Sequence, residues 1–161
     1  FITGERLARL QAITSTVYPE RASTGQVATE DLAGVLAQTG GGAVVSLLVS
    51  QVAPGRKNGL VVEVHGATES LRFAQERPEE LWIGRRAGSG LHLRSTDELH
   101  PGAARFSVLP PGHPLGYQDA FTAFAADTYA AVRGTAPEGL PVFADGLRAV
   151  RITDAVLASA R

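Results

Sequence analysis

The residue that best combines reactive chemistry with a rigid setting is His113. It follows Pro110-Pro111-Gly112 and precedes Pro114, directly before a segment with helical periodicity. An imidazole can donate or accept a hydrogen bond near neutral pH, and the prolines restrict the backbone that carries it. This setting predicts a side chain that hydrogen-bonds a hydroxyl such as that of a sugar. The alternative is a loop histidine that bonds only to the backbone.

Two further polar side chains follow on the first turns of the expected helix. Tyr117 begins an apolar stripe, so it either packs in a core or extends its hydroxyl toward a binding pocket. Asp119 lies where the positive end of the helix dipole favours a carboxylate, which is a sufficient reason for its presence. Of the two, Tyr117 is the candidate substrate-binding residue.

A basic turn lies between two apolar segments, where Arg56, Lys57 and Asn58 follow Pro54-Gly55. Basic side chains in a turn are commonly just solvated. The other interpretation is contact with an anionic or polyol substrate, or with a partner domain. Both interpretations remain open, and all three residues are candidate substrate-binding residues.

A polar and aromatic group consists of Gln75, Glu76, Arg77 and Trp82. A tryptophan can stack on the apolar face of a sugar, but a single tryptophan more often belongs to a core or an interface. We therefore expect this group to be structural.

The composition argues against several kinds of site. The chain has 161 residues, enough for one domain, and its 15 basic and 16 acidic residues leave a net charge of −1. The absence of cysteine excludes disulfides, cysteine nucleophiles and thiolate metal sites. No basic stripe favours nucleic acid, no apolar run of about 18 residues predicts a membrane helix, and the four histidines lack metal-ligand spacing. These features are typical of a cytoplasmic protein.

The periodicity predicts strands first and helices last. Residues 20–27 and 85–111 are expected to be irregular, apart from one short strand near Leu91–Arg94, and Gly134 is expected to end the first helix. Such an order predicts an α+β fold, a largely antiparallel, open-faced sheet with helices packed on one face. The expected strands are 7–17, 32–38, 43–53, 60–65, 70–75 and 81–84, and the expected helices are 117–134 and 144–160.

One face of the predicted sheet has nothing in the chain to cover it. This face carries Val44, Leu48, Val61 and several Ser and Thr residues. Exposed apolar surface of this kind often marks an interface, and two-fold self-association is the commonest assembly. We therefore expect a homodimer or tetramer that forms through the sheet face; a solvated sheet is the alternative.

A nicotinamide cofactor has no complete site in this sequence. No G-x-G-x-x-G turn opens a helix after a strand, and the triglycine at 40–42 leads into a strand instead. A P-loop and a G-x-S-x-G motif are also absent. Methionine is missing and the chain begins with Phe1, which we interpret as the start of a fragment.

Four segments, taken together, resemble the C-terminal domain of the glucose–fructose oxidoreductase / inositol dehydrogenase / MocA (Gfo/Idh/MocA) oxidoreductases. Their order and spacing make the resemblance specific, and it covers the whole chain. The segments are Gly55-Arg56-Lys57-Asn58, Gln75-Glu76-Arg77-Pro78 through Trp82, Pro111-Gly112-His113-Pro114-Leu115-Gly116-Tyr117-Gln118-Asp119-Ala120-Phe121, and Phe143-Ala144-Asp145-Gly146-Leu147-Arg148-Ala149-Val150.

The resemblance implies a fold, and it implies that substrate binding and cofactor binding belong to different domains. The fold would be that of a glyceraldehyde-3-phosphate dehydrogenase-like C-terminal domain, with residues 1–161 as one substrate-binding and oligomerisation domain. A Rossmann domain before Phe1 would hold NAD or NADP and the catalytic residues, so we expect no catalytic, cofactor-binding or metal-binding residue in this chain. His113 would face the substrate pocket, and Arg56, Lys57 and Asn58 would lie near the cleft between the domains.

The function implied is that of an NAD(P)-dependent oxidoreductase, a dehydrogenase of a sugar, inositol or related polyol. The 161 residues alone should be inactive, because the redox chemistry belongs to the cofactor. An alternative from another class is a stand-alone interaction module that dimerises through its sheet and has no small-molecule site.

Overall fold

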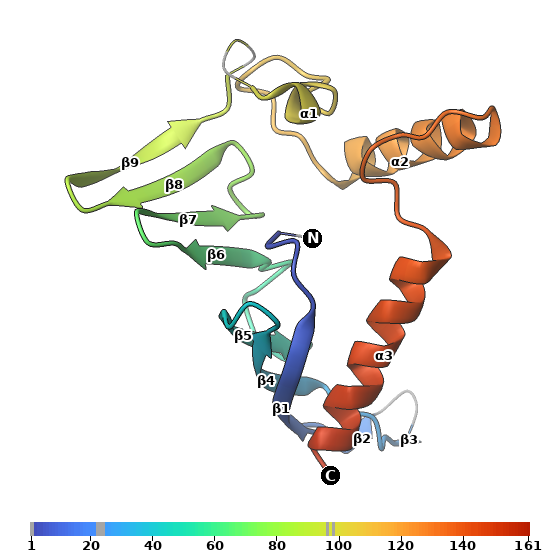
Figure 1. The fold of residues 1–161 in the computed structure, drawn as a ribbon. Coiled ribbons are helices and arrows are strands. Elements are labelled where there is room, and N and C mark those ends of the chain that lie inside the picture. Colours follow the sequence, from blue (N-terminus) through green and yellow to red (C-terminus); the bar gives the residue numbers. More distant parts are fainter. Residues whose placement is uncertain (1, 22–24, 96, 98) are drawn as a thin grey trace. The chain divides into compact units, whose positions relative to one another are not determined.

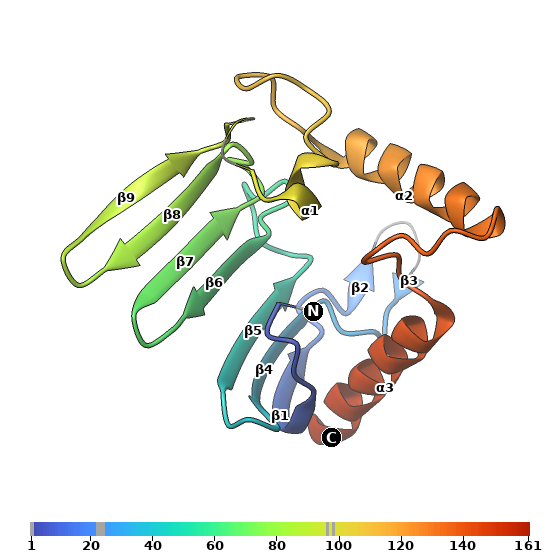
Figure 2. The ribbon, with the colours of Figure 1, turned by 45° about the horizontal axis from the view of Figure 1, so that its top comes forward.

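The computed structural model describes residues 2–21, 25–95, 97 and 99–161. Antiparallel strands and three helices make up this part of the chain, so the predicted α+β fold is confirmed (Figures 1 and 2). The chain divides into two compact units. The first consists of Phe1–Gly55 and Pro141–Arg161, and the second of Arg56–Leu140.

The first unit is built on a three-stranded antiparallel sheet in the order β1-β4-β5. The predicted hairpin at residues 39–42 is confirmed: Gly42 donates a hydrogen bond to the Thr39 carbonyl at 3.0 Å, and its φ of +92° is one that a side chain with a Cβ rarely adopts. The strands are β1 (Leu7–Ser15), β4 (Leu32–Thr39) and β5 (Val44–Ser50), with a short hairpin of β2 (Glu20–Arg21) and β3 (Gly25–Gln26) in the segment expected to be irregular.

Helix α3 (Phe143–Ser159) packs against β1, beside which it runs in Figure 2. The backbone N–H of Ala12 donates a hydrogen bond to Ser159 Oγ at 3.0 Å. Ala12 and Ala37 are the buried hydrophobic residues of the described chain, with exposed fractions of 9% and 6%. Such small side chains let the helix and sheet approach closely, but they bury little apolar area.

The opposite face of this sheet is open. Strand pairing places Ile13, Gly34 and Leu48 in one row, and Ile13 and Leu48 are 78% and 73% exposed. Val44 shares this face and is also exposed, as the sequence predicts. Val61 was expected on the same face but belongs to the sheet of the second unit, because the chain turns at residues 54–58 before β6 begins.

The second unit contains a four-stranded antiparallel sheet in the order β6-β7-β8-β9. Its hairpins follow the sequence order, and Arg85 pairs with Gly88 in a turn that the sequence left irregular. The unit comprises β6 (Val61–His65), β7 (Glu69–Ala74), β8 (Glu80–Arg85), β9 (Gly88–Leu93), α1 (Pro101–Ala104), which was not expected, and α2 (Tyr117–Val132).

Helix α2 has the predicted apolar stripe and the predicted end. Gly134 has a φ of +92° and closes the helix by donating to the Ala131 carbonyl at 3.0 Å. The stripe is nevertheless exposed: Phe121 is 62% and Val132 78% accessible. The described part of the chain thus leaves an apolar helix face that would gain free energy from contact with further protein.

Asp31 links the strands of the first unit. Asp31 as a whole residue is 4% exposed. Its carboxylate accepts hydrogen bonds from the backbone N–H groups of Val17 at 2.8 Å and Tyr18 at 3.1 Å, and from Arg21 Nη2 at 3.5 Å. The Val17 hydrogen bond has the largest effect and lowers the pKa of Asp31; burial opposes it, while Tyr18 and Arg21 act in the same direction as Val17. The ionised carboxylate therefore stabilises the folded state.

Because the pKa of Asp31 is lower in the folded chain than its ordinary value of 3.8, the stabilising effect of the carboxylate is present above that value and is lost as the pH falls through the folded pKa. We predict that Asp31→Asn lowers Tm at pH 7 and that the difference from wild type shrinks below about pH 4. Thermal unfolding followed by circular dichroism over this pH range measures it. Asp154→Asn, at an exposed site on α3, is the control; equal effects of the two substitutions would contradict the assignment.

Candidate functional site

The loop that carries His113 joins α1 to α2 in the second unit, and we call residues 107–115 the His113 loop. Gly112 has a φ of +86°, and the His113 N–H donates to the Pro110 carbonyl at 3.2 Å. These features form a tight turn in a segment whose prolines have no N–H to donate.

Arg94, just after β9, holds this loop from the sheet side. Its Nε lies 2.8 Å from Glu79 Oε2 and 3.1 Å from Oε1. Its Nη1 donates to Ser107 Oγ at 2.6 Å and to the Leu109 carbonyl at 2.8 Å. Its Nη2 donates to the carbonyls of Pro110 at 3.1 Å and His113 at 3.0 Å.

The side chains of His113 and Tyr117 are accessible. Tyr117 is 66% exposed and its ring meets that of Phe121 edge-on, with 5.3 Å between the centroids. The core position that the sequence offered as one interpretation of Tyr117 is therefore not observed. Among the described residues, neither the His113 imidazole nor the Tyr117 hydroxyl has a hydrogen-bond partner, so both are available to a ligand.

Both long helices begin with their own carboxylate. Asp119 Oδ2 accepts the N–H of Gly116 at 2.8 Å at the start of α2, and Asp145 Oδ2 accepts the N–H of Val142 at 3.0 Å at the start of α3. A pyrophosphate placed there would meet a negative charge where a dinucleotide site needs free N–H groups. Neither of these two helix starts therefore offers a free N–H group to a dinucleotide.

The basic turn precedes β6 and shows one fixed contact. Arg56 Nη1 lies 3.2 Å from Glu76 Oε2, and Gly55 adopts a φ of +83° that allows the turn. Lys57 and Asn58 are exposed, and the Asn58 carbonyl accepts the N–H of Leu60 at 2.9 Å. Of these three candidates, Arg56 lines the cavity described next.

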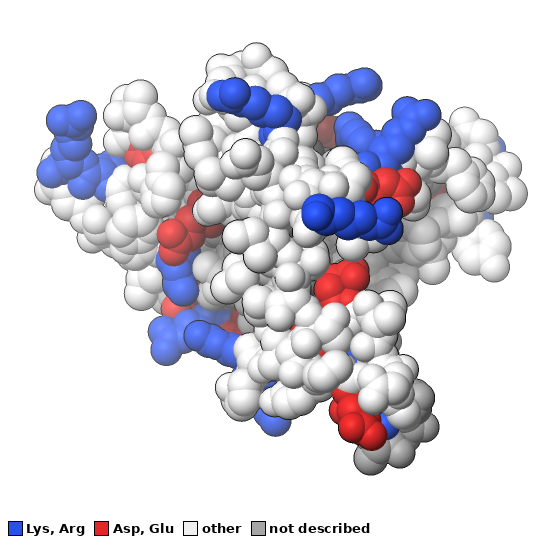
Figure 3. Space-filling model, turned by 90° about the horizontal axis from the view of Figure 1, so that it is seen from below, with Lys and Arg blue, Asp and Glu red and all other residues white. Residues whose placement is uncertain are grey.

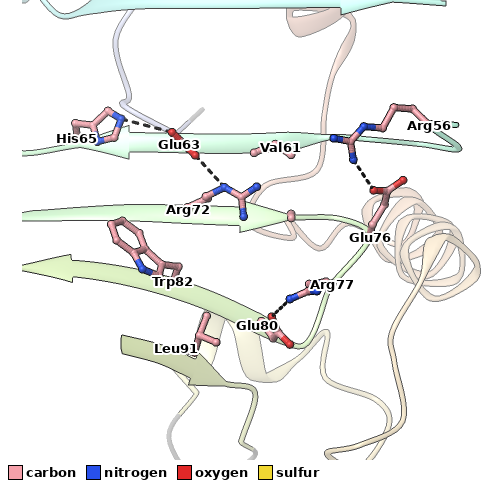
Figure 4. Close-up of a pocket in the computed structure, with 11 residues that line it drawn as sticks. Arg56, Val61, Glu63, His65, Arg72, Glu76, Arg77, Glu80, Trp82 and Leu91 are labelled. Atoms are coloured by element: carbon pink, nitrogen blue, oxygen red, sulfur yellow. Dashed lines mark hydrogen bonds and ion pairs between the residues drawn. The ribbon is translucent and has the colours of Figure 1, made fainter. Parts of the chain in front are cut away.

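That cavity, which we call the polar hollow, lies on one face of the β6-β7-β8-β9 sheet and has a volume of about 550 Å³ (Figure 4). The strand register places Glu63, Arg72, Trp82 and Leu91 in one row across all four strands. The lining residues are Arg56, Val61, Glu63, His65, Arg72, Ala74, Glu76, Arg77, Glu80, Trp82 and Leu91.

The charges of the polar hollow balance. Glu63 lies 2.9 Å from Arg72 and 3.7 Å from His65, Glu76 pairs with Arg56, and Glu80 Oε2 lies 3.6 Å from Arg77 (Figure 4). Three arginines and three glutamates thus leave no net charge when His65 is neutral. A surface of this kind offers donors and acceptors together, which suits a neutral hydroxylated molecule better than an anion.

Trp82 lies flat against its own strand. A Cβ added to Gly84, two residues further along β8, would overlap Cη2 of the indole. Glycine at this position therefore lets the ring lie along the sheet at the bottom of the polar hollow. Of the polar and aromatic group noted in the sequence, Glu76, Arg77 and Trp82 line this hollow, and the structural role expected of the group stays a prediction.

The described part of the chain contains no cluster of metal ligands. No group of three or more His, Cys, Asp or Glu side chains there could hold a metal ion. None of its helices is long and apolar enough to cross a membrane. On the face in Figure 3, charged side chains of both signs lie in small groups among larger uncharged areas.

The structure brings the predicted site residues to two places in the second unit. Arg56 lies in the polar hollow with Glu76 and Trp82, whereas His113 and Tyr117 lie on the His113 loop and α2. Sequence reasoning missed Glu79 and Arg94. Their signal was a pair of opposite charges one step beyond the Glu80–Leu93 pair of a hairpin, which a register prediction would have placed face to face.

Comparison with known proteins gives the family. Residues 1–72 match the family model of the GFO/IDH/MocA C-terminal domain. A levoglucosan dehydrogenase of Pseudarthrobacter phenanthrenivorans is 27% identical over 99% of this chain and 46% of its own length. Residues 1–72 therefore belong to the GFO/IDH/MocA C-terminal domain family, and the similarity to this relative extends over nearly the whole chain.

Solved structures agree with this assignment over nearly the whole chain. An oxidoreductase from Sinorhizobium meliloti matches with a TM-score of 0.85 and 31% identity, over 99% of this chain and 46% of its own. An inositol dehydrogenase homolog from Azotobacter vinelandii, complexed with NAD+, matches with a TM-score of 0.83 and 27% identity, over 99% of this chain and 42% of its own. The chain thus spans less than half the length of these relatives.

The charge balance of the polar hollow predicts how it responds to anions. Glu63→Gln leaves Arg72 without its carboxylate, so inorganic phosphate should bind about fivefold more tightly than to wild type at low ionic strength. Phosphate titration followed by NMR chemical shifts measures this, and 0.5 M NaCl should remove the difference through screening.

Glu69→Gln is the matched control, because Glu69 pairs with Arg85 on the same sheet outside the hollow. Equal phosphate affinity of the two variants would contradict the charge argument.

Proposed function

We propose that this chain is the substrate-binding and oligomerisation domain of an NAD(P)-dependent oxidoreductase that acts on a sugar, inositol or related polyol. The observation that carries the proposal is the match of nearly the whole chain to sugar and inositol dehydrogenase relatives at less than half their length. The remaining part of such a protein would be a Rossmann domain that holds the cofactor, NAD or NADP. Cytoplasmic location remains a prediction of the same proposal.

The chemistry of the second unit supports a neutral substrate. His113 and Tyr117 present an imidazole and a phenol from a loop and a helix start that are held by hydrogen bonds. In this proposal they hydrogen-bond substrate hydroxyls, and Arg56, Lys57 and Asn58 contribute from the basic turn. An arginine already paired with a carboxylate, as Arg56 is, would donate to a hydroxyl without requiring a negative charge on the substrate.

The redox step would take place outside residues 1–161. The carboxylate caps of α2 and α3 disfavour a pyrophosphate at these two helix starts. The nicotinamide would supply hydride transfer when bound to its own domain. The apolar stripe of α2 is a surface against which that domain would pack.

Self-association is the second part of the proposal. The open face of the β1-β4-β5 sheet exposes Ile13, Leu36 and Leu48 and would be covered by the same face of another copy. A two-fold contact of this kind repeats every favourable interaction. The same exposed face also favours the alternative function, a stand-alone interaction module without a small-molecule site.

The test of the proposal is a turnover assay on the native full-length protein. Reduction of NAD+ or NADP+ is followed at 340 nm with a panel of sugars, anhydrosugars and inositols, and residues 1–161 alone are assayed beside it. Turnover by the full protein and none by residues 1–161 supports the proposal. A full protein that binds neither cofactor nor polyol supports the interaction module instead.

Removal of one hydroxyl tests the substrate contact. Tyr117→Phe should raise KM for the polyol about tenfold, the effect of one lost hydrogen bond, and leave the Kd of the cofactor unchanged. Steady-state kinetics and a cofactor titration measure the two quantities. Tyr129→Phe is the matched control, because Tyr129 lies on the same helix and is also 66% exposed; an equal rise in KM for both variants would remove Tyr117 from the site.

A charge on the open face tests the assembly. Leu48→Glu should weaken self-association at least tenfold, because two carboxylates would have to be buried at a two-fold contact. Analytical ultracentrifugation measures the equilibrium. Leu47→Glu, on the same strand and the opposite face, should leave it unchanged. A wild type that stays monomeric at high concentration rules out the dimer.

A further inference from the structure

The guanidinium of Arg94 uses its full hydrogen-bonding capacity within the protein. An arginine carries five N–H groups in a fixed plane. In Arg94 the Nε–H donates to Glu79, and the two Nη groups donate to Ser107, Leu109, Pro110 and His113. Its side chain is 10% exposed. This arginine therefore has no donor left for a ligand and acts through the groups that it holds.

Glu79 contacts both Arg94 and the His113 loop. Its carboxylate pairs with Arg94 Nε, and Oε1 also accepts the N–H of Leu115 at 3.4 Å. The backbone joins the same two residues, since the Arg94 N–H donates to the Glu79 carbonyl at 2.9 Å. The pair thus reaches both ends of the His113 loop, Ser107 at one and Leu115 at the other.

The sequence of the loop makes such an external anchor necessary. Prolines at 110, 111 and 114 have no N–H and cannot form backbone hydrogen bonds as donors. Arg94 donates from outside the loop to the carbonyls of Leu109, Pro110 and His113, of which the Pro110 carbonyl also accepts the N–H of His113. Arg94 thus bonds to the backbone of the same residue that carries the imidazole.

We propose that Arg94 and Glu79 are positioning residues that fix the His113 imidazole and the start of α2 for binding of the polyol. This inference rests on the proposed function, because it takes His113 and Tyr117 as the substrate contacts. Arg94 itself touches no substrate. Loosening the pair releases the loop, so the imidazole samples more positions and the substrate binds less well, while the cofactor is unaffected.

The informative substitution is Arg94→Lys in the native full-length protein. Lysine keeps the charge opposite Glu79 but has three donors on a flexible chain, so it cannot reach the four loop acceptors in one plane. Arg105→Lys is the matched control. Arg105 is also in the second unit, pairs with Asp127 at 3.0 Å and donates to the Glu138 carbonyl at 2.7 Å, but it has no bond to the His113 loop.

The first measurement does not depend on activity. Hydrogen–deuterium exchange of peptides covering residues 107–117 should be about tenfold faster in Arg94→Lys than in wild type and unchanged in Arg105→Lys. Glu79→Gln, which keeps the side-chain shape, should produce a smaller increase centred on Leu115. Unchanged exchange in Arg94→Lys would overturn the anchoring itself.

The second measurement separates positioning from general stability. Arg94→Lys should raise the polyol KM about tenfold, with less than a twofold change in kcat and in the Kd of the cofactor. Faster exchange with an unchanged KM would overturn the positioning role. A wild type without polyol turnover would overturn the proposed function and the positioning role with it, and exchange would then still decide whether Arg94 anchors the loop.

Discussion

In the described part of this chain, the helices cover too little of the sheets to bury their apolar side chains. Each of its two main sheets has two faces, but among the described residues α3 on β1 is the extensive contact between a helix and a strand. The hydrophobic residues that become buried are two alanines, Ala12 and Ala37, and large side chains on the open face and on α2 remain accessible. A chain of this size normally encloses a core of large side chains. The apolar faces would therefore gain free energy from being covered by other protein, and the local structure is held largely by strand pairing, by Asp31 and by Arg94.

The pairing of charges in the second unit and at the helix starts decides which ligands these surfaces favour. The arginines of the polar hollow are each paired with a glutamate, and the helix starts are occupied by Asp119 and Asp145. Neither arrangement leaves an uncompensated positive charge for a phosphate. The paired charges of the second unit therefore suit a neutral, hydroxylated ligand better than an anion, which is the kind of ligand that the proposed function requires.

The parts of the fold that the sequence predicted are those determined by local pattern. The alternation in residues 43–53 and 60–65, the glycine turn at 40–42 and the end of α2 at Gly134 depend on neighbouring residues alone. The pairs β2–β3 and Arg94–Glu79 depend on residues brought together by folding, and the sequence analysis missed them. The candidate site was missed for the same reason, because it too depends on residues brought together by folding. Arg56 and Trp82 were considered separately in the sequence, and the pairing of the strands places both in the lining of the polar hollow. The side-chain chemistry of His113 was visible in the sequence, whereas the donor that holds its backbone was not.

The acceptors that Arg94 uses have a consequence for how this domain can diversify. Three of them are the main-chain carbonyls of Leu109, Pro110 and His113, which are present whatever side chain occupies those positions. Replacement of the imidazole by another group would leave these three attachments intact. The side chains of this loop can therefore change during evolution while the backbone that carries them keeps its shape.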